Sequence, residues 1–201
     1  MVRTSNLTSE ERKKKTVQAV VKLCKEEEPS SLTTANIAKE MNVTQGALFR
    51  HFPSKDSIWE AVALWVSGHI LQLLESEVSE EKTPIENLNS IYKAHVKFIS
   101  SHPGIPRFMF SKLIDRDKNP SQKIISSLMF QYRNILAEQI KKGIERGCIS
   151  SKVNVDAAIS LYIGSIQGLA VSLLLDNKEV NMNLLADNMF DIFIEGIESK
   201  V

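Results

Sequence analysis

The segment from Thr33 to Lys55 constrains the fold of this chain more than any other part, because it predicts two short helices joined by a tight turn. A threonine at its start, Thr33 or Thr34, can cap the first helix by accepting a hydrogen bond from a first-turn amide. Asn42 tolerates the left-handed conformation that ends a helix, and Thr44 is placed to cap the second helix. We therefore expect two helices that pack across a corner.

The second helix of this segment has an apolar face and a polar face. Leu48 and Phe52 are four residues apart, so they face the same side and are expected to be buried together. The opposite face carries residues that can hydrogen-bond, stack or leave room for close approach, namely Thr44, Gln45, Gly46, Phe49 and Arg50. A helix that lies in the major groove of DNA needs these properties. The segment therefore predicts a helix-turn-helix that reads DNA.

The order and spacing of these residues resemble the helix-turn-helix of the TetR/AcrR family of transcriptional regulators. The resemblance is carried by the I-A-K-E-M-N-V turn, by T-Q-G-A-L-F-R-H-F and by P-S-K-D, and it is close over about residues 8–65. It implies a dimeric, sequence-specific regulator that represses transcription and leaves its operator when a small-molecule effector binds. Its partners would be a near-palindromic double-stranded DNA operator, a second copy of the chain and an unknown effector.

The resemblance implies eight DNA contacts, all on or beside the two short helices: Thr34, Thr44, Gln45, Gly46, Phe49, Arg50, His51 and Lys55. Thr34, His51 and Lys55 would contact phosphates. Thr44 and Gln45 would contact phosphates or base edges.

Arg50 is the candidate for direct readout, through a bidentate pair with guanine. Gly46 would let the backbone approach the sugar–phosphate chain, and Phe49 would pack on a sugar or a thymine methyl group. Simpler interpretations stay open: His51 packs against the first helix of the chain, Arg50 pairs with a phosphate and reads no base, and Lys55 is only a surface residue at the start of a helix.

Outside this segment the apolar spacing is helical and no alternating run predicts a strand, so the expected class is all-α with about nine helices. We expect a three-helix DNA-binding domain over residues 1–55 and a larger ligand-binding and dimerisation domain over residues 56–201. Residues 1–55 carry ten Lys and Arg against six Asp and Glu, whereas the remainder carries fifteen against eighteen. The positive end therefore coincides with the proposed DNA reader, as a phosphate backbone requires.

Helix boundaries are marked by capping signals. Thr8 with Glu11, and Thr83 with Glu86, predict capping boxes at two helix starts. The last two predicted helices have apolar faces wider than a monomer can bury, and Gly164 and Gly168 leave a flat strip on the first of them. We expect a homodimer through a four-helix bundle made from this pair in each subunit, which the resemblance also implies.

A ligand pocket between helices is expected to be mostly apolar with a few polar groups. The candidates are bulky or polar residues of the central helices: Trp65, Tyr92, His95, Phe98, Phe108, Met129, Tyr132, Arg133 and Gln167. Each of them is alternatively a plain core or surface residue.

Other classes of function find little support in the sequence. Cys24 and Cys148 are the only cysteines and have no metal-type spacing, so we expect reduced thiols, no metal and no cofactor. No nucleophile–base arrangement predicts an enzyme, although an all-helical enzyme using His95 and a ligand-independent DNA-binding regulator remain the alternatives.

The N-terminus has no signal core, and no window approaches the ~20 apolar residues of a membrane span. We therefore expect a cytoplasmic protein that does not enter a membrane.

Overall fold

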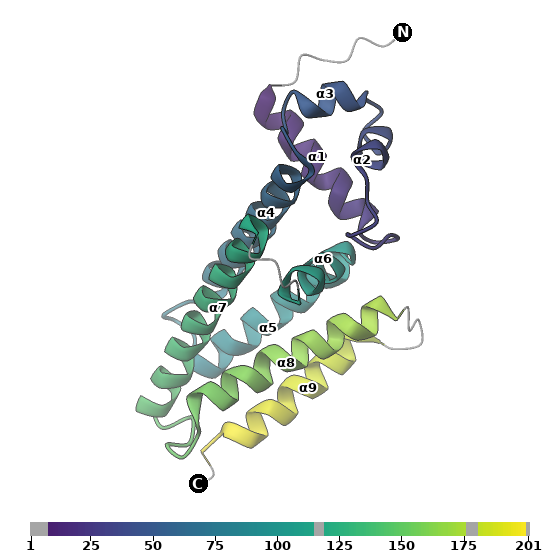
Figure 1. Ribbon diagram of the computed structural model, residues 1–201. Coiled ribbons are helices and arrows are strands. Elements are labelled where there is room, and N and C mark those ends of the chain that lie inside the picture. The colour runs from purple at the N-terminus through teal and green to yellow at the C-terminus, as the bar shows by residue number, and fades with distance from the viewer. Residues whose placement is uncertain (1–7, 115–118, 176–180, 200–201) are drawn as a thin grey trace. The chain divides into compact units, whose positions relative to one another are not determined.

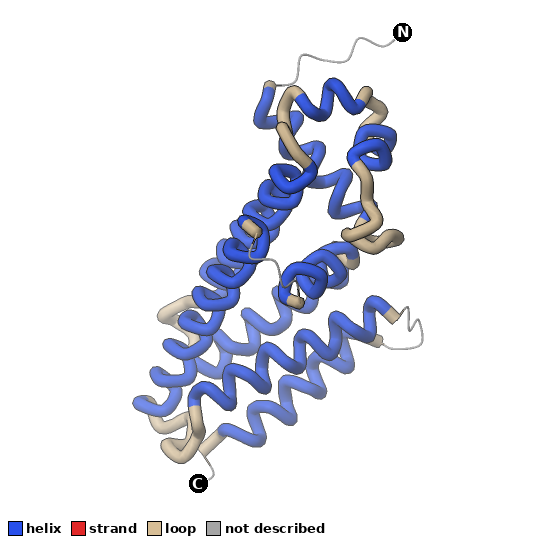
Figure 2. Tube along the Cα trace, in the orientation of Figure 1, coloured by secondary structure: helices blue, strands red, loops and turns tan. Residues whose placement is uncertain are grey.

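The computed structural model describes residues 8–114, 119–175 and 181–199, and these residues are helical apart from loops and one isolated antiparallel bridge between Ile149 and Glu198 (Figures 1 and 2). The helices are α1 (Ser9–Leu23), α2 (Thr34–Glu40), α3 (Gln45–Phe49), α4 (Lys55–Glu77), α5 (Pro84–Ser101), α6 (Gly104–Leu113), α7 (Pro120–Glu145), α8 (Val155–Leu174) and α9 (Met182–Ile197). The all-α class and the expected number of helices are confirmed for this part of the chain.

The chain divides into two compact units. The N-terminal unit contains Met1–Gly68 and Gly104–Ser126, and the C-terminal unit contains His69–Pro103 and Ser127–Val201. Because the divisions fall inside α4 and α7, each of these helices contributes residues to both units. Compactness does not assign a function, so the functional division after residue 55 stays a prediction.

Both predicted capping boxes are present. At the start of α1, the Thr8 hydroxyl accepts from the Glu11 amide at 3.2 Å, and the Glu11 carboxylate accepts from the Thr8 amide at 2.7 Å. The same exchange joins Thr83 and Glu86 at the start of α5. Each box satisfies two backbone donors that a helix start otherwise leaves unpaired, so these boundaries follow from local sequence.

Two helices contradict the expectation that no segment is apolar enough to span a membrane. α4 and α8 meet that criterion by length and composition, with 44% and 39% of their apolar windows buried. A core helix of a non-membrane protein meets it equally well. Helix α8 is apolar on both its buried and its exposed sides: Ile159 and Tyr162 lie in the core, while Leu161 and Val171 are exposed. The expectation was wrong because it sought an unbroken apolar run and overlooked a helix that is apolar on most sides.

In the N-terminal unit, α6 rests directly on the end of α1. A Cβ atom built on Gly104 would lie 2.1 Å from the Val21 carbonyl oxygen and 2.9 Å from the Lys25 amide nitrogen. Nearby, the Phe108 ring of α6 stacks on Trp59 of α4, with ring centroids 5.7 Å apart and planes at 19°. Glycine at position 104 is therefore a requirement of backbone-to-backbone packing.

Gly104→Ala should destabilise the protein by about 1–3 kcal/mol or more, because the added methyl group meets backbone atoms that cannot rotate away. Urea denaturation measures the change in the free energy of unfolding. Gly68→Ala is the matched control: its added methyl group meets nothing within 4 Å, and in a helix interior it should stabilise by roughly 0.5–1 kcal/mol. Equal effects of the two substitutions would contradict the packing argument.

Candidate nucleic-acid interface

Helix α3 is held against α2 by its apolar side and by the turn before it. Asn42 adopts the predicted left-handed conformation with φ 55°, and the Val43 amide then donates to the Ala38 carbonyl at 2.9 Å. Leu48 and Phe52 are 2% and 3% exposed, so the predicted burial is confirmed. These contacts fix which face of α3 points outward.

The outward face is the one that the sequence predicts. Thr44, Gln45, Gly46 and Arg50 are exposed, and 44% of the Phe49 surface is accessible to solvent. The Thr44 hydroxyl caps α3 by accepting from the Ala47 amide at 3.2 Å. The exposure of this face is confirmed, whereas its contacts with DNA stay a prediction.

The three remaining candidates make contacts inside the N-terminal unit. The Thr34 hydroxyl accepts from Gln45 Nε2 at 3.1 Å, and His51 Nδ1 lies 3.2 Å from the Ser9 hydroxyl of α1. Lys55 Nζ donates to the Ser30 carbonyl at 3.4 Å and lies 5.9 Å from the centroid of the Trp59 ring. The packing alternatives for His51 and Lys55 therefore stay open beside their phosphate roles.

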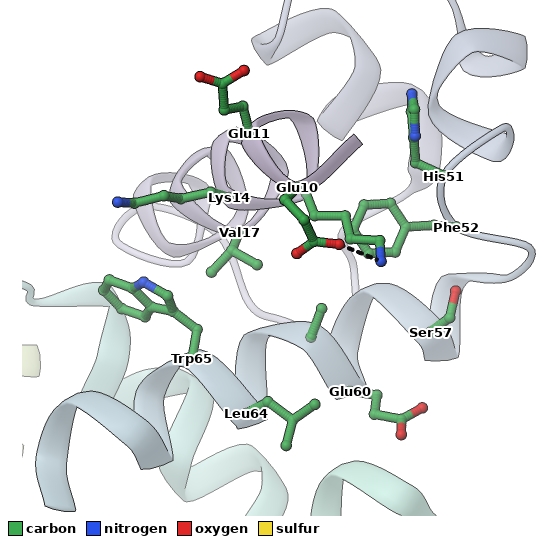
Figure 3. A pocket seen from close by; sticks show the side chains of 12 residues that line it. Glu10, Glu11, Lys14, Val17, His51, Phe52, Ser57, Glu60, Leu64 and Trp65 are labelled. Atoms are coloured by element: carbon green, nitrogen blue, oxygen red, sulfur yellow. Dashed lines mark hydrogen bonds and ion pairs between the residues drawn. The ribbon is translucent and has the colours of Figure 1, made fainter. Parts of the chain in front are cut away.

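An open groove of about 620 Å³ lies between α1 and α4 in the same unit (Figure 3). Val17 and Trp65 lie along it, and Leu64, 56% exposed, is part of its wall. Charged residues from both helices also line it: Glu10, Glu11, Lys13, Lys14 and Glu60. The rest of the lining is His51, Phe52, Ser57 and Ala61. This groove could not be predicted from the sequence, because it forms between helices that are far apart in the chain.

A polar network lies inside the C-terminal unit. His95 Nδ1 is 2.9 Å from the Tyr132 hydroxyl, and the Tyr92 hydroxyl is 2.9 Å from the Ser165 hydroxyl. Burial lowers the pKa of His95 to about 4, and burial raises the pKa of Tyr132. At neutral pH His95 and Tyr132 are uncharged and hydrogen-bonded to each other, and Tyr92 is paired separately with Ser165, so each of these polar side chains has a partner.

The nine candidates for ligand contact divide between the two units. Trp65 and Phe108 belong to the N-terminal unit, whereas the other seven belong to the C-terminal unit. Phe98 lies against the His102 ring, with centroids 4.9 Å apart. Arg133 donates to the Asp156 carboxylate at 3.2 Å. Met129 on α7 and Gln167 on α8 are half-buried. Their role as ligand contacts stays a prediction.

A second groove, of about 360 Å³, lies between α5 and α9 in the C-terminal unit. Its lining contains none of the nine candidates and consists of Lys93, Val96, Lys97, Asn183, Ala186 and Asp187. Lys93 pairs with Asp187 at 3.2 Å across it. The positions 93, 96 and 97 share one side of a helix, and this spacing is the sequence signal that could have indicated one wall of the groove.

Helices α8 and α9 expose large apolar side chains in the C-terminal unit. Leu161 and Val171 on α8 are 66% and 44% exposed, and Leu184 and Ile192 on α9 are 57% and 70% exposed. Gly164 and Gly168 lie between the two α8 residues in sequence, and Cβ atoms built there would meet nothing within 4 Å. This surface is apolar and sterically open, as a helix–helix interface requires.

Metal ligands do not gather in the part of the chain that the structure describes: no three His, Cys, Asp or Glu residues there are placed to share an ion. Cys24 is buried, which raises the pKa of its thiol to about 12, and Cys148 is a second free thiol. A thiol with so high a pKa is unreactive at neutral pH, so Cys24 acts as a core residue.

Two family models match the chain. The model of bacterial regulatory proteins of the tetR family matches residues 17–62, and that of the C-terminal region of YsiA-like proteins matches residues 66–196. The nucleoid occlusion factor SlmA of Idiomarina loihiensis is 24% identical over 159 residues, which are 77% of this chain and 81% of the relative.

Solved structures share the fold over nearly the whole chain. The ketosteroid transcriptional regulator KstR2 of Mycobacterium tuberculosis aligns with a TM-score of 0.78 and 17% identity, covering 98% of both chains. The regulator FadR from Bacillus subtilis, solved in complex with stearoyl-CoA, aligns with a TM-score of 0.77 and 20% identity, covering 92% of this chain and 98% of FadR.

The lowered pKa of His95 predicts a loss of stability in acid. The unfolded chain binds a proton at His95 near pH 6.5, whereas the folded chain does so only near pH 4. The free energy of unfolding should therefore fall by up to about 3 kcal/mol between these values and be unaffected by this group above pH 7.

His95→Gln keeps a hydrogen-bonding partner for Tyr132 and does not titrate, so its free energy of unfolding should depend less on pH between 4 and 6.5. Urea denaturation at a series of pH values measures the difference. An unchanged slope in His95→Gln would show that His95 titrates normally.

Proposed function

Because the chain belongs to the tetR family of bacterial regulatory proteins, and is therefore a DNA-binding transcriptional regulator, we propose that it is a homodimeric repressor released from a near-palindromic operator by a small-molecule effector. The resemblance that the segment from Thr33 to Lys55 carries is thereby confirmed. The observation that carries the proposal is the outward face of α3, exposed along one side and anchored by buried Leu48 on the other.

The DNA-reading step follows from the geometry of the N-terminal unit. Exposed Gln45 and Arg50 lie at the two ends of α3 and can both reach base edges in a major groove. Phosphate contacts from Thr34, His51 and Lys55 fix the register, and these contacts carry no sequence information themselves. In a two-fold dimer the two copies of α3 read half-sites about 34–36 Å apart.

The dimer forms through the exposed apolar surface of α8 and α9. The two glycines on α8 let a helix of the second copy approach closely, while Leu161 and Ile192 supply apolar area. Burying such area yields roughly 25 cal/mol per Å², which favours association over exposure to water. The pair of helices from each subunit makes a four-helix bundle.

Effector binding acts as a population shift. A ligand that favours one arrangement of the chain changes operator affinity by its differential binding, commonly ~1–3 kcal/mol. Helix α4 carries residues of both units and follows the DNA-reading segment directly, so we assign it the coupling role. Similarity to FadR makes stearoyl-CoA the first effector to test. The protein acts in the cytoplasm, with the DNA that it reads.

The ligand-independent alternative has one specific observation in its favour, the similarity to SlmA, a nucleoid occlusion factor. In that case the C-terminal unit would serve dimerisation and other partners. The enzyme alternative rested on His95, which is hydrogen-bonded to Tyr132 in the network described above. We therefore expect no turnover at this residue.

Selection from random DNA duplexes should yield a two-fold symmetric operator, and fluorescence anisotropy should show that stearoyl-CoA weakens operator binding by roughly 5–150-fold. Stearic acid and free coenzyme A, which are the two halves of stearoyl-CoA, are the controls. Release by no acyl-CoA would favour the ligand-independent regulator, and a failure to select any sequence would overturn the proposed function.

Leu161→Lys should convert the dimer to a monomer without unfolding it, because the charge lies in the proposed interface. Light scattering coupled to size-exclusion chromatography measures the mass. Phe130→Lys is the matched control: Phe130 on α7 is also 66% exposed but lies outside the α8–α9 surface, so the dimer should persist. Identical masses for the two variants would place the interface elsewhere.

A further inference from the structure

The hydrogen bond between Gln45 and Thr34 joins the first residues of two different helices. Gln45 Nε2 donates to Thr34 Oγ1 at 3.1 Å, across eleven positions of sequence. Gln45 is exposed and Thr34 is half-buried. A side chain as long as glutamine has many rotamers in solution, so this bond restricts which way its amide faces.

A threonine hydroxyl has one proton to donate and can accept at its lone pairs. A phosphate diester offers only hydrogen-bond acceptors, so a hydroxyl that binds phosphate must donate its single proton to a phosphate oxygen. When Thr34 contacts a phosphate of DNA, its oxygen can then only accept from Gln45. The DNA-bound state therefore requires the orientation seen here, with Nε2 toward Thr34.

An amide held in this way presents a defined pattern to the groove. One hydrogen of Nε2 is occupied by Thr34, while Oε1 and the second hydrogen remain available side by side. Adenine presents the complementary pair in the major groove, with its N6 amino group as donor and N7 as acceptor. Guanine offers two acceptors at the same edge, so it would place O6 against Oε1 without a proton between them.

We propose that Thr34 couples a phosphate contact to base selection by fixing the amide of Gln45, and that Gln45 thereby specifies adenine at one position of each operator half-site. This inference rests on the proposed DNA-binding function and adds the base that is read and the residue that positions the reader. Thr34 is the positioning residue, and Gln45 is the specificity-determining residue.

The first test compares affinities for the selected operator with each of the four bases at every half-site position, by fluorescence anisotropy. At one position the wild-type protein should prefer adenine by about tenfold or more, within the range of a bidentate contact. Gln45→Ala should reduce that preference to about twofold and leave the other positions unchanged. A Gln45-dependent preference for guanine or thymine would overturn the proposed orientation.

The second test removes one atom of the base. Replacing the preferred adenine by 7-deazaadenine deletes the N7 acceptor while keeping base pairing. The wild-type protein should lose about tenfold in affinity, because one of the two bonds of the bidentate pair is gone. Gln45→Ala should lose less than about twofold, because its contact is already absent. Equal losses in both proteins would show that another residue reads N7.

The third test separates positioning from simple phosphate binding. Thr34→Val keeps the shape of the side chain and removes the hydroxyl, so it should lower the adenine preference although Gln45 is intact. Thr34→Ser should restore the preference, and circular dichroism checks that both variants fold. Lys55→Ala is the control for a phosphate contact, which weakens binding to all sequences alike. If Thr34→Val keeps the full preference, the coupling does not exist.

Failure of the inference and failure of the proposed function give different results. A wild-type protein that binds no DNA sequence selectively contradicts the function. A protein that selects an operator but shows no Gln45-dependent adenine contradicts only the inference.

Discussion

The proposed base contacts of Gln45 and Arg50 depend on the burial of Leu48 and Phe52. Helix α3 has five residues, which is too short to be stable on its own in water. Its orientation is therefore supplied by packing, through two apolar side chains that are almost inaccessible to solvent. Because burial of one side fixes the rotation of α3 about its axis, it also determines which residues face the groove.

Much of this local structure could be predicted because its causes lie within a few residues of one another. Thr44 caps α3 and Asn42 ends the preceding helix through interactions that span three to five positions. The capping boxes at Thr8 and Thr83 are of the same kind. Helical periodicity was likewise sufficient to predict the all-α class, because the apolar spacing within each amphipathic helix indicates its buried side.

Features that depend on pairs of distant helices could not be read from the sequence. The network of His95 and Tyr132 joins α5 to α7, and the bond between Thr34 and Gln45 joins α2 to α3. The first requires knowledge of which helices are neighbours, and the second requires knowledge of how two helices that were predicted to be neighbours are rotated. The groove beside Trp65 has the same origin, because its walls come from α1 and α4. Periodicity identifies the buried side of a helix and leaves its neighbour undetermined.

The contact of Gly104 with the end of α1 has a mechanical consequence. Helices that meet through side chains can absorb a small displacement, because rotamers exchange and the interface deforms. At Gly104 two main chains meet with no side chain between them, so there is nothing to deform. At this point α6 cannot move closer to α1 without displacing the main chain of α1. We therefore expect a displacement of α6 toward α1 to be passed directly to α1, which packs against α2 of the DNA-reading segment.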